Sequence, residues 1–177
     1  PVDYGPVLDE LRADGSLSDA TRRRLARAAF AHTAAYDAAI VHWLDTLDDG
    51  AGPLPPTLHL SLERTGTLRY GENPHQEGAR YRESGQAGWW DEAVVHGGKA
   101  MSYLNLFDTE AAWRLVHCLG DEPTAVVMKH ANPCGAAVGA DIAAAYLAAH
   151  ECDTVSAFGG IVAVNRPVTL AMAEALS

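Results

Sequence analysis

Lysine, cysteine and long apolar runs are all scarce in this sequence of 177 residues. The only lysines are Lys99 and Lys129, and 23 acidic residues outnumber 13 basic ones, which gives a formal net charge of −10. The parts on either side of Gly88 are both acidic, which argues against a sequence-independent binder of duplex nucleic acid. No apolar run approaches the roughly 20 residues that a membrane helix needs, so no membrane segment is expected.

Cysteine usage and the N-terminus indicate the setting of the chain. The three cysteines, Cys118, Cys134 and Cys152, cannot all pair within the chain, and no Cys-x-x-Cys spacing occurs. A reduced, cytoplasmic protein with free thiols is therefore expected. The first residues show neither the basic start nor the apolar stretch of a signal peptide. Because the sequence does not begin with Met, we expect a piece of a longer protein.

The remaining composition is typical of a folded α/β protein. With 48% hydrophobic and 20% charged residues, one domain, or one plus part of another, is expected. Helical spacing predicts a helix over 17–44, capped by Ser18, and the Gly- and Pro-rich stretch after it predicts a linker over 48–57. Alternation, apolar runs and capping residues then predict a strand at 58–62, a helix from an N-cap at Asp108 to Cys118, a strand at 124–128, a helix at 141–152, a strand at 161–164 and a last helix from Pro167.

The strand, helix and strand between 124 and 164 predict a parallel βαβ unit with a right-handed crossover. The Gly-rich segment before its second strand, Ser156–Gly160, would let a ligand approach the backbone closely. In a parallel unit, however, the start of the second strand lies at the end opposite Lys129. Either that strand begins earlier, near Thr154, or the segment reaches a site by another route, and both interpretations stay open.

Two polar segments offer chemistry. Lys129 and His130 directly follow a predicted buried strand, beyond whose end ligands of open α/β sheets collect. An imidazole accepts a proton near neutral pH, and an ammonium stabilises developing negative charge. In the segment 68–76, Arg69 is suited to clamp a phosphate and Tyr70 to stack on a heterocycle. The competing interpretations are a strand ending in a solvated lysine and a capping histidine, and an ordinary polar loop.

Four motifs follow one another along the chain. They are Leu68–Gln76, Gly98-Lys99 with Ser102-Tyr103, Lys129–Gly135, and Ser156–Gly160 with Asn165-Arg166. With these motifs in this order, the chain resembles, over nearly its whole length, the bifunctional purine-biosynthesis family that joins phosphoribosylaminoimidazolecarboxamide (AICAR) formyltransferase to IMP cyclohydrolase. Residues 17–44 are similar to the helical end of the cyclohydrolase domain.

The resemblance implies transfer of a formyl group from the co-substrate 10-formyltetrahydrofolate to the 5-amino group of AICAR, with no metal required, followed in the full protein by cyclisation to IMP. His130 would take the proton of the attacking amine, and Lys129 would stabilise charge on the formyl oxygen. The residues implied to bind AICAR are Arg69, Tyr70 and Gly159, and more weakly Asn73, Ser156 and Phe158.

The resemblance also implies an α/β fold in two parts. Residues 1–47 would be the C-terminal helical part of the cyclohydrolase domain, and 58–177 the first part of a cytidine-deaminase-like formyltransferase domain. A cytoplasmic homodimer without nucleic-acid or membrane partners is implied for the full protein, and this piece alone is expected to be inactive.

Two alternatives stay open. One is a zinc-dependent deaminase-like enzyme. Cys134 in Pro-Cys-Gly resembles half of that signature, although the His-x-Glu motif and the second cysteine are missing. The other alternative is a non-catalytic fragment left by proteolysis of the full enzyme.

Overall fold

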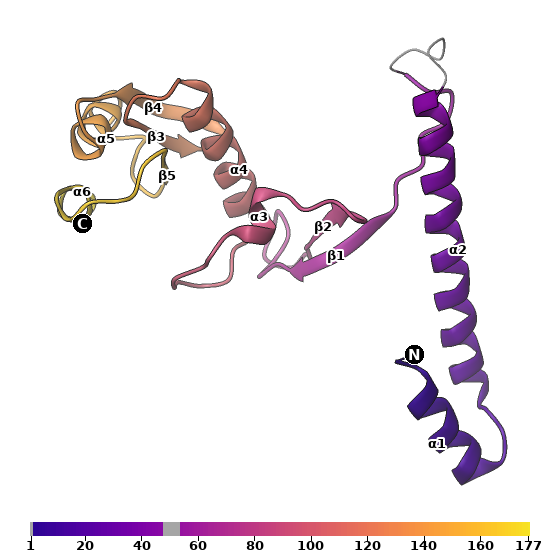
Figure 1. The fold of residues 1–177 in the computed structure, drawn as a ribbon. Helices are drawn as coiled ribbons and strands as arrows, with labels where there is room; N and C mark the ends of the chain where they lie inside the picture. Colours follow the sequence, from indigo (N-terminus) through magenta and orange to yellow (C-terminus); the bar gives the residue numbers. More distant parts are fainter. Residues whose placement is uncertain (1, 48–53) are drawn as a thin grey trace. The chain divides into compact units, whose positions relative to one another are not determined.

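The computed structural model describes residues 2–47 and 54–177. Backbone contacts divide the chain into two compact units, residues 1–63 with 81–93, and residues 64–80 with 94–177. The expected α/β composition is confirmed, and within the described ranges no helix is long and apolar enough to cross a membrane. The elements in Figure 1 are α1 (Tyr4–Asp14), α2 (Asp19–Leu47), β1 (Leu62–Thr67), β2 (Ala79–Glu83), α3 (Trp89–Glu92), α4 (Tyr103–Cys118), β3 (Thr124–Lys129), β4 (Asn132–Val138), α5 (Ile142–Glu151), β5 (Ile161–Val164) and α6 (Leu170–Leu176).

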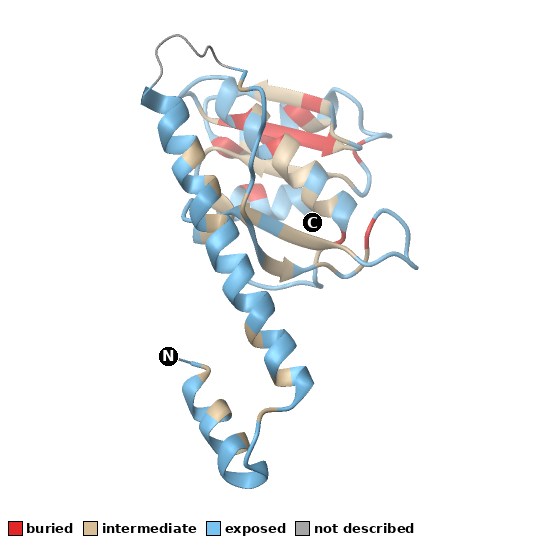
Figure 2. Ribbon diagram, turned by 90° about the vertical axis from the view of Figure 1, so that its right-hand side faces the viewer, coloured by how far each residue is buried: buried red, intermediate tan, exposed pale blue. Residues whose placement is uncertain are grey.

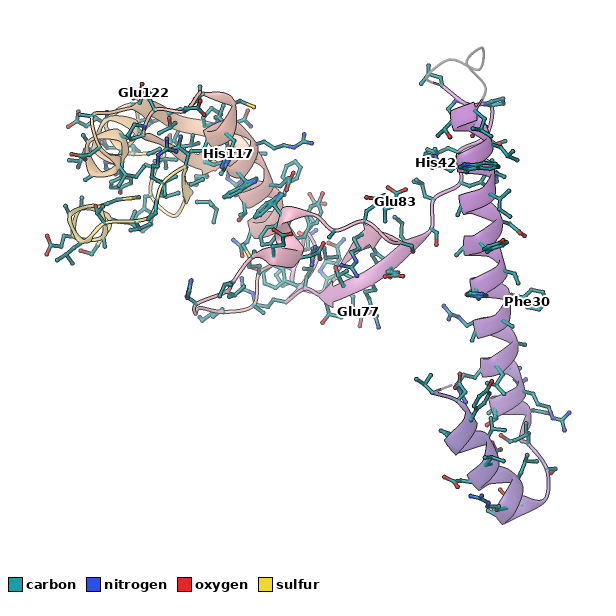
Figure 3. All side chains as sticks on the ribbon, in the orientation of Figure 1. Phe30, His42, Glu77, Glu83, His117 and Glu122 are labelled. Atoms are coloured by element: carbon teal, nitrogen blue, oxygen red, sulfur yellow. The ribbon has the colours of Figure 1, made fainter. Side chains whose placement is uncertain are left out.

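Helices α1 and α2 make up most of the first unit. The predicted cap of α2 is confirmed, because the Ser18 hydroxyl accepts a hydrogen bond from the Thr21 amide at 3.2 Å. The Ser18 amide in turn donates to the Glu10 carboxylate at 2.7 Å, which joins the two helices. Hydrogen bonds from Ser18 and Thr21 lower the pKa of Glu10 to about 2. No residue of α2 is buried, and Phe30 projects from it into solvent (Figure 3).

The segment after α2 departs from the prediction. Residues 48–53 of the predicted linker lie outside the described residues, and the domain boundary there stays a prediction. The strand predicted at 58–62 is wrong, because β1 begins at Leu62 and pairs with β2. The alternating side chains Leu58, Leu60 and Leu62 are all exposed. Alternation produces a strand where one face is buried, and these leucines have no such face in this chain.

The sheet of the second unit has the order β4-β3-β5, with β3 antiparallel to both neighbours. The predicted parallel pairing of the strands at 124–128 and 161–164 is therefore wrong. The sequence interpretation missed β4, because Asn132–Gly135 has the composition of a turn. Pro133 in fact lies beside a register shift of this edge strand, a position where a sheet tolerates proline. The crossover through α5 joins β4 to β5, and β3 lies between them.

The central strand β3 is buried on both faces (Figure 2). Ala125 and Val127 pack toward α5 and α6, whereas Val126 and Met128 pack toward α4. Burying a side chain of this size stabilises a fold by roughly 1.5–3 kcal/mol. The two-sided core therefore fixes the position of the end of β3, at Lys129.

The helices that cover the sheet begin at polar caps. The helix predicted at 141–152 is confirmed as α5, and Asp141 is its N-cap, accepting from the Ala144 amide at 2.9 Å. Helix α4 begins earlier than predicted, because Ser102 and Asn105 form a reciprocal capping box. Asp108 is therefore inside α4, and its predicted role as an N-cap is wrong. Thr169 caps α6, which begins at Leu170 rather than at Pro167.

Candidate active site

A strained two-residue turn carries His130 at the tip of the sheet. His130 and Ala131 join β3 to β4, and both have a φ of +53°. This backbone conformation matches the twist of a hairpin but favours Asn-Gly. Each residue with a side chain costs roughly 1–2 kcal/mol in the left-handed region. Strain of this kind is found at functional sites, where the surrounding structure holds it, so the turn is the first candidate.

Lys129, the last residue of β3, connects the turn to the segment before β5. Its Nζ donates a hydrogen bond to the backbone oxygen of Phe158 at 3.0 Å. Antiparallel pairing explains this contact, because Ile161 lies opposite Met128 and the segment before it therefore lies beside the end of β3. The sequence left two routes open for Ser156–Gly160, and the structure shows the one that does not need a longer strand.

Glycine allows the close approach of this segment to β3. Gly159 has a φ of +76°, a conformation that glycine adopts without steric cost. A Cβ on Gly160 would lie 2.9 Å from the backbone oxygen of Met128. The two glycines thus bring the chain against the sheet next to Lys129.

A pocket of about 460 Å³ opens beside the turn. It includes three of the predicted site residues, Lys129, His130 and Ser156, and Phe158 contacts one of them through the hydrogen bond from Lys129. Gly159 follows Phe158 in the chain and does not line the pocket. The side chain of Phe158 is 86% exposed. The complete lining is Lys129, His130, Asn132, Pro133, Cys134, Asp153 and Ser156.

Asp153 is a site residue that the sequence reasoning missed. Its carboxylate accepts a hydrogen bond from the Ser156 amide at 2.9 Å. The spacing Asp-x-x-Ser is typical of such a local turn and is the signal that could have found it. Hydrogen bonds from Ser156 lower the pKa of Asp153, and the charge of Lys129 adds to this effect. The pocket thus places a carboxylate, an ammonium and an imidazole together.

Arg69 and Tyr70 lie in a second group, on the loop that follows β1. The Arg69 guanidinium lies 4.7 Å from the centroid of the Tyr70 ring and donates to its hydroxyl at 3.1 Å. The backbone of the pair is held at both ends, since the Arg69 amide donates to Met101 and the Tyr103 amide donates to Tyr70. The exposed guanidinium and the half-buried ring therefore form one unit.

Asn73 lies in a loop that closes on itself through Gln76. The backbone and side-chain nitrogens of Asn73 both donate to the Gln76 side-chain oxygen, at 2.7 and 3.3 Å. A pocket of about 540 Å³ lies against this loop, next to Glu77, which is labelled in Figure 3. Neither Arg69, Tyr70 nor Asn73 lines the pocket of His130.

Helix α4 connects the two groups. Its first residue, Tyr103, bonds to the backbone of Tyr70, and Asp108 accepts a hydrogen bond from the Ala131 amide at 2.8 Å. Five residues of α-helix rise about 7.5 Å. The start of α4 thus contacts both the Arg69–Tyr70 loop and the turn that carries His130.

The side chains that line the pocket beside the turn include an ammonium, an imidazole and a thiol. Over residues 2–47 and 54–177, no group of three or more His, Cys, Asp or Glu side chains is arranged to hold a metal ion. Cys134 lines the pocket as a free thiol. An ammonium that stabilises an oxyanion and an imidazole that accepts a proton are the tools of acyl-group transfer.

The fold and site define an α/β protein with a lysine–histidine pair at the tip of a sheet, and similarity to known proteins identifies its family. The profile of the AICARFT/IMPCHase bienzyme family matches residues 1–177. The chain is 50% identical over 186 residues to the bifunctional purine biosynthesis protein PurH of Sorangium cellulosum (strain So ce56), covering 99% of this chain and 35% of that protein. It is 49% identical over 179 residues to the PurH protein of Myxococcus xanthus (strain DK1622), covering 100% of this chain and 34% of that protein.

This chain belongs to the AICARFT/IMPCHase bienzyme family, and the resemblance noted in the sequence is confirmed. It spans about a third of the length of the curated relatives it matches.

Proposed function

We propose that this chain carries the catalytic pair of an AICAR formyltransferase, which moves a formyl group from 10-formyltetrahydrofolate to the 5-amino group of AICAR. The position of Lys129 and His130 carries the proposal. They lie at the tip of β3, with Lys129 Nζ 3.0 Å from the oxygen of Phe158 and a pocket beside them. Membership of the family supports a role in purine biosynthesis.

The proposed reaction needs two tools that this pair supplies. The amine of AICAR is a poor nucleophile, because its lone pair is delocalised into the imidazole ring and the carboxamide. His130 takes the amine proton as the nitrogen bonds to the formyl carbon. Lys129 stabilises the negative charge that develops on the formyl oxygen. The bond from the formyl carbon to the folate nitrogen then breaks, and tetrahydrofolate leaves with a proton.

The hydrogen bond from Lys129 to Phe158 is compatible with the proposed role of the lysine. An ammonium has three donors, and one of them is used on the Phe158 oxygen. That bond fixes the direction of the side chain, and the other donors remain for a ligand oxygen. Asp153 also lines this pocket, and hydrogen bonds from Ser156, together with the charge of Lys129, lower the pKa of its carboxyl.

The nucleotide is proposed to bind through both groups of residues. Arg69 holds the phosphate dianion and Tyr70 stacks on the heterocycle. Close backbone approach at Gly159 and the exposed ring of Phe158 supply further contacts. Asn73 and Ser156 complete the predicted set.

The domain organisation is part of the same proposal. Residues 58–177 form the first part of a formyltransferase domain with a cytidine-deaminase-like fold. Residues 1–47 form the helical end of a cyclohydrolase domain, and 48–57 link the two. We further propose that the longer protein is a cytoplasmic homodimer. Ring closure to IMP would take place in a part of that protein outside this chain. The lack of buried residues in α2 supports packing against parts outside this chain.

The test is His130→Ala in the natural full-length protein. We expect formyl transfer to fall about 10²–10⁴-fold, with cyclisation to IMP nearly unchanged. His117→Ala is the matched control, because His117 lies on α4 against Trp113 (Figure 3) and is expected to leave both activities intact. Formyl transfer by the His130 variant within a few-fold of wild type would end the assignment.

Two measurements decide the alternatives. Stoichiometric zinc in the purified full-length protein would favour a deaminase-like enzyme over the formyltransferase. The isolated 177-residue chain is expected to be inactive in both reactions and to associate, because 29 large apolar residues are exposed among residues 2–47 and 54–177. A clean monomer by light scattering that turns over AICAR would contradict both expectations.

A further inference from the structure

An aspartate in the interior of α4 contacts the strained turn from outside the sheet. Asp108 Oδ1 accepts a hydrogen bond from the Ala131 amide at 2.8 Å. Aspartate is a poor residue for a helix interior, and the cap of this helix is Ser102. The side chain of Asp108 therefore serves a tertiary contact rather than the helix itself.

The Ala131 amide, which donates to Asp108, does not take part in the backbone hydrogen bonds between the two strands of the hairpin. In a two-residue turn the flanking residues make the ladder bonds, here Lys129 and Asn132. The amide of the second turn residue points away from them. A carboxylate gives this donor a charge-assisted bond, which is stronger than a bond between neutral groups.

We propose that Asp108 is the positioning residue of the site. Its bond to the Ala131 amide holds His130 and Ala131 in the left-handed conformation and thereby fixes where the His130 imidazole points. The hydrogen bond between Asp108 and Ala131 holds the turn whatever the reaction is, whereas its effect on the rate of formyl transfer rests on the proposed function. Asp108 acts through His130 and does not itself touch the reacting atoms.

The placement of Asp108 also sets the turn relative to the second group of residues. The same helix begins at Tyr103, whose amide donates to the backbone of Tyr70 at 3.1 Å. Movement of the turn away from α4 would therefore change the distance between His130 and the Arg69–Tyr70 pair. A lost anchor should lower kcat, which depends on that alignment, more than it weakens binding of either substrate.

Four variants of the full-length protein test the anchor. Asp108→Ala removes the acceptor, and we expect kcat for formyl transfer to fall about 10- to 100-fold with the KM of both substrates nearly unchanged. Asp108→Asn keeps a side-chain oxygen and should stay within about threefold of wild type. Ala131→Gly alone should be nearly neutral. Because glycine adopts the left-handed conformation without steric cost, Asp108→Ala with Ala131→Gly should recover most of the lost kcat.

Glu110→Ala is the matched control, because Glu110 lies on the same helix and pairs with Arg114. It should leave kcat unchanged. A kcat for Asp108→Ala within twofold of wild type, a loss in Asp108→Asn as large as in Asp108→Ala, or no recovery in the double variant would each overturn the inference. A merely structural role would lower the unfolding temperature of Asp108→Ala and leave kcat per folded molecule as in wild type.

Hydrogen exchange of the turn separates this inference from the proposed function. We expect mass spectrometry to show faster exchange in the peptide that contains 129–132 for Asp108→Ala, and exchange close to that of wild type for Asp108→Asn, which keeps the acceptor oxygen. If Lys129→Met keeps full formyl transfer, the proposed function fails, and the exchange result still decides whether Asp108 anchors the turn. Unchanged exchange in Asp108→Ala would overturn the anchor whatever the kinetics show.

Discussion

The Lys129–His130 turn and the Arg69–Tyr70 loop carry the two halves of the candidate site, and different forces hold them. Pairing of β3 with strands on both sides holds the turn, and the core of the second unit is built around β3. The Arg69–Tyr70 loop is held by single backbone bonds to the start of α4 and by its own side chains. Burial thus fixes the first half of the site, and hydrogen bonds between exposed and half-buried residues fix the second.

This difference has a consequence for mutation. A change far from His130 can move the turn, because the sheet transmits a shift in packing to its end. A change at Arg69 or Tyr70 should stay local, since both side chains are near the surface and contact each other. We therefore expect mutations in the sheet to have larger effects than mutations in the Arg69–Tyr70 loop.

The largest expected effect on stability comes from Gly135→Ala in the sheet. A Cβ at Gly135 would lie 1.8 Å from the backbone oxygen of Ala149, so α5 would have to move away from β4. Overpacking costs about 1–3 kcal/mol and sometimes more, and a clash with backbone places this variant at the upper end. Urea unfolding followed by circular dichroism should show the loss of stability.

Gly66→Ala is the control for that comparison. Gly66 lies in β1, and no atom lies within 4 Å of the position that its Cβ would take. Its unfolding free energy should stay close to that of wild type. Equal midpoints for the two alanine variants would show that α5 does not hold the sheet as closely as the structure indicates.

Replacement of Lys129 should lower turnover, with the sheet left intact. Lys129→Arg keeps the charge, but a planar guanidinium does not occupy the place of a compact ammonium, here 3.0 Å from the Phe158 oxygen. Loss of one donor to a developing oxyanion costs about 10²–10³-fold in kcat. Steady-state turnover measures it, and normal turnover by Lys129→Met would show that the lysine is only structural.

Sequence patterns predicted the sheet-held half only in part. The buried strand before Lys129 and the strand at 161–164 were visible as apolar runs, and both are confirmed. The strand β4 was not visible in the sequence, because Asn132–Gly135 has the composition of a turn. The actual turn consists of His130 and Ala131, which are not typical turn residues. Long-range pairing overrides local preference here, and it also reverses the direction of β5 relative to β3.

The site residues also divide into those that a local sequence pattern predicts and those that only a long-range contact reveals. Lys129 and His130 follow an apolar run and could be found from it, and Ser156 follows from the glycines near it. Asp108 could not be found, because its partner Ala131 lies 23 positions away in the sequence and no local pattern connects them. Asp153 could have been found from its spacing to Ser156.

Arg69→Ala should affect binding rather than turnover. A charge-assisted bond to a phosphate dianion contributes roughly 1.5–3 kcal/mol, so the KM for AICAR should rise about 10- to 100-fold. The KM for the folate should change little. Kinetics with each substrate varied in turn decide this, and a defect mainly in folate binding would place Arg69 in the other half of the site.

The smallest expected effect is that of Tyr70→Phe. The variant keeps the ring on which the Arg69 guanidinium lies at 4.7 Å and loses only the hydroxyl that accepts from Arg69 at 3.1 Å. Loss of one exposed hydrogen bond, worth about 0.5–1.5 kcal/mol, should raise the KM for AICAR by about threefold to tenfold. Tyr70→Leu removes the ring as well and should be worse, because stacking on the heterocycle is lost together with the support of Arg69. If Tyr70→Phe costs as much as Arg69→Ala, the hydroxyl itself holds the nucleotide, and the loop binds through a fixed polar contact rather than through its paired ring and guanidinium.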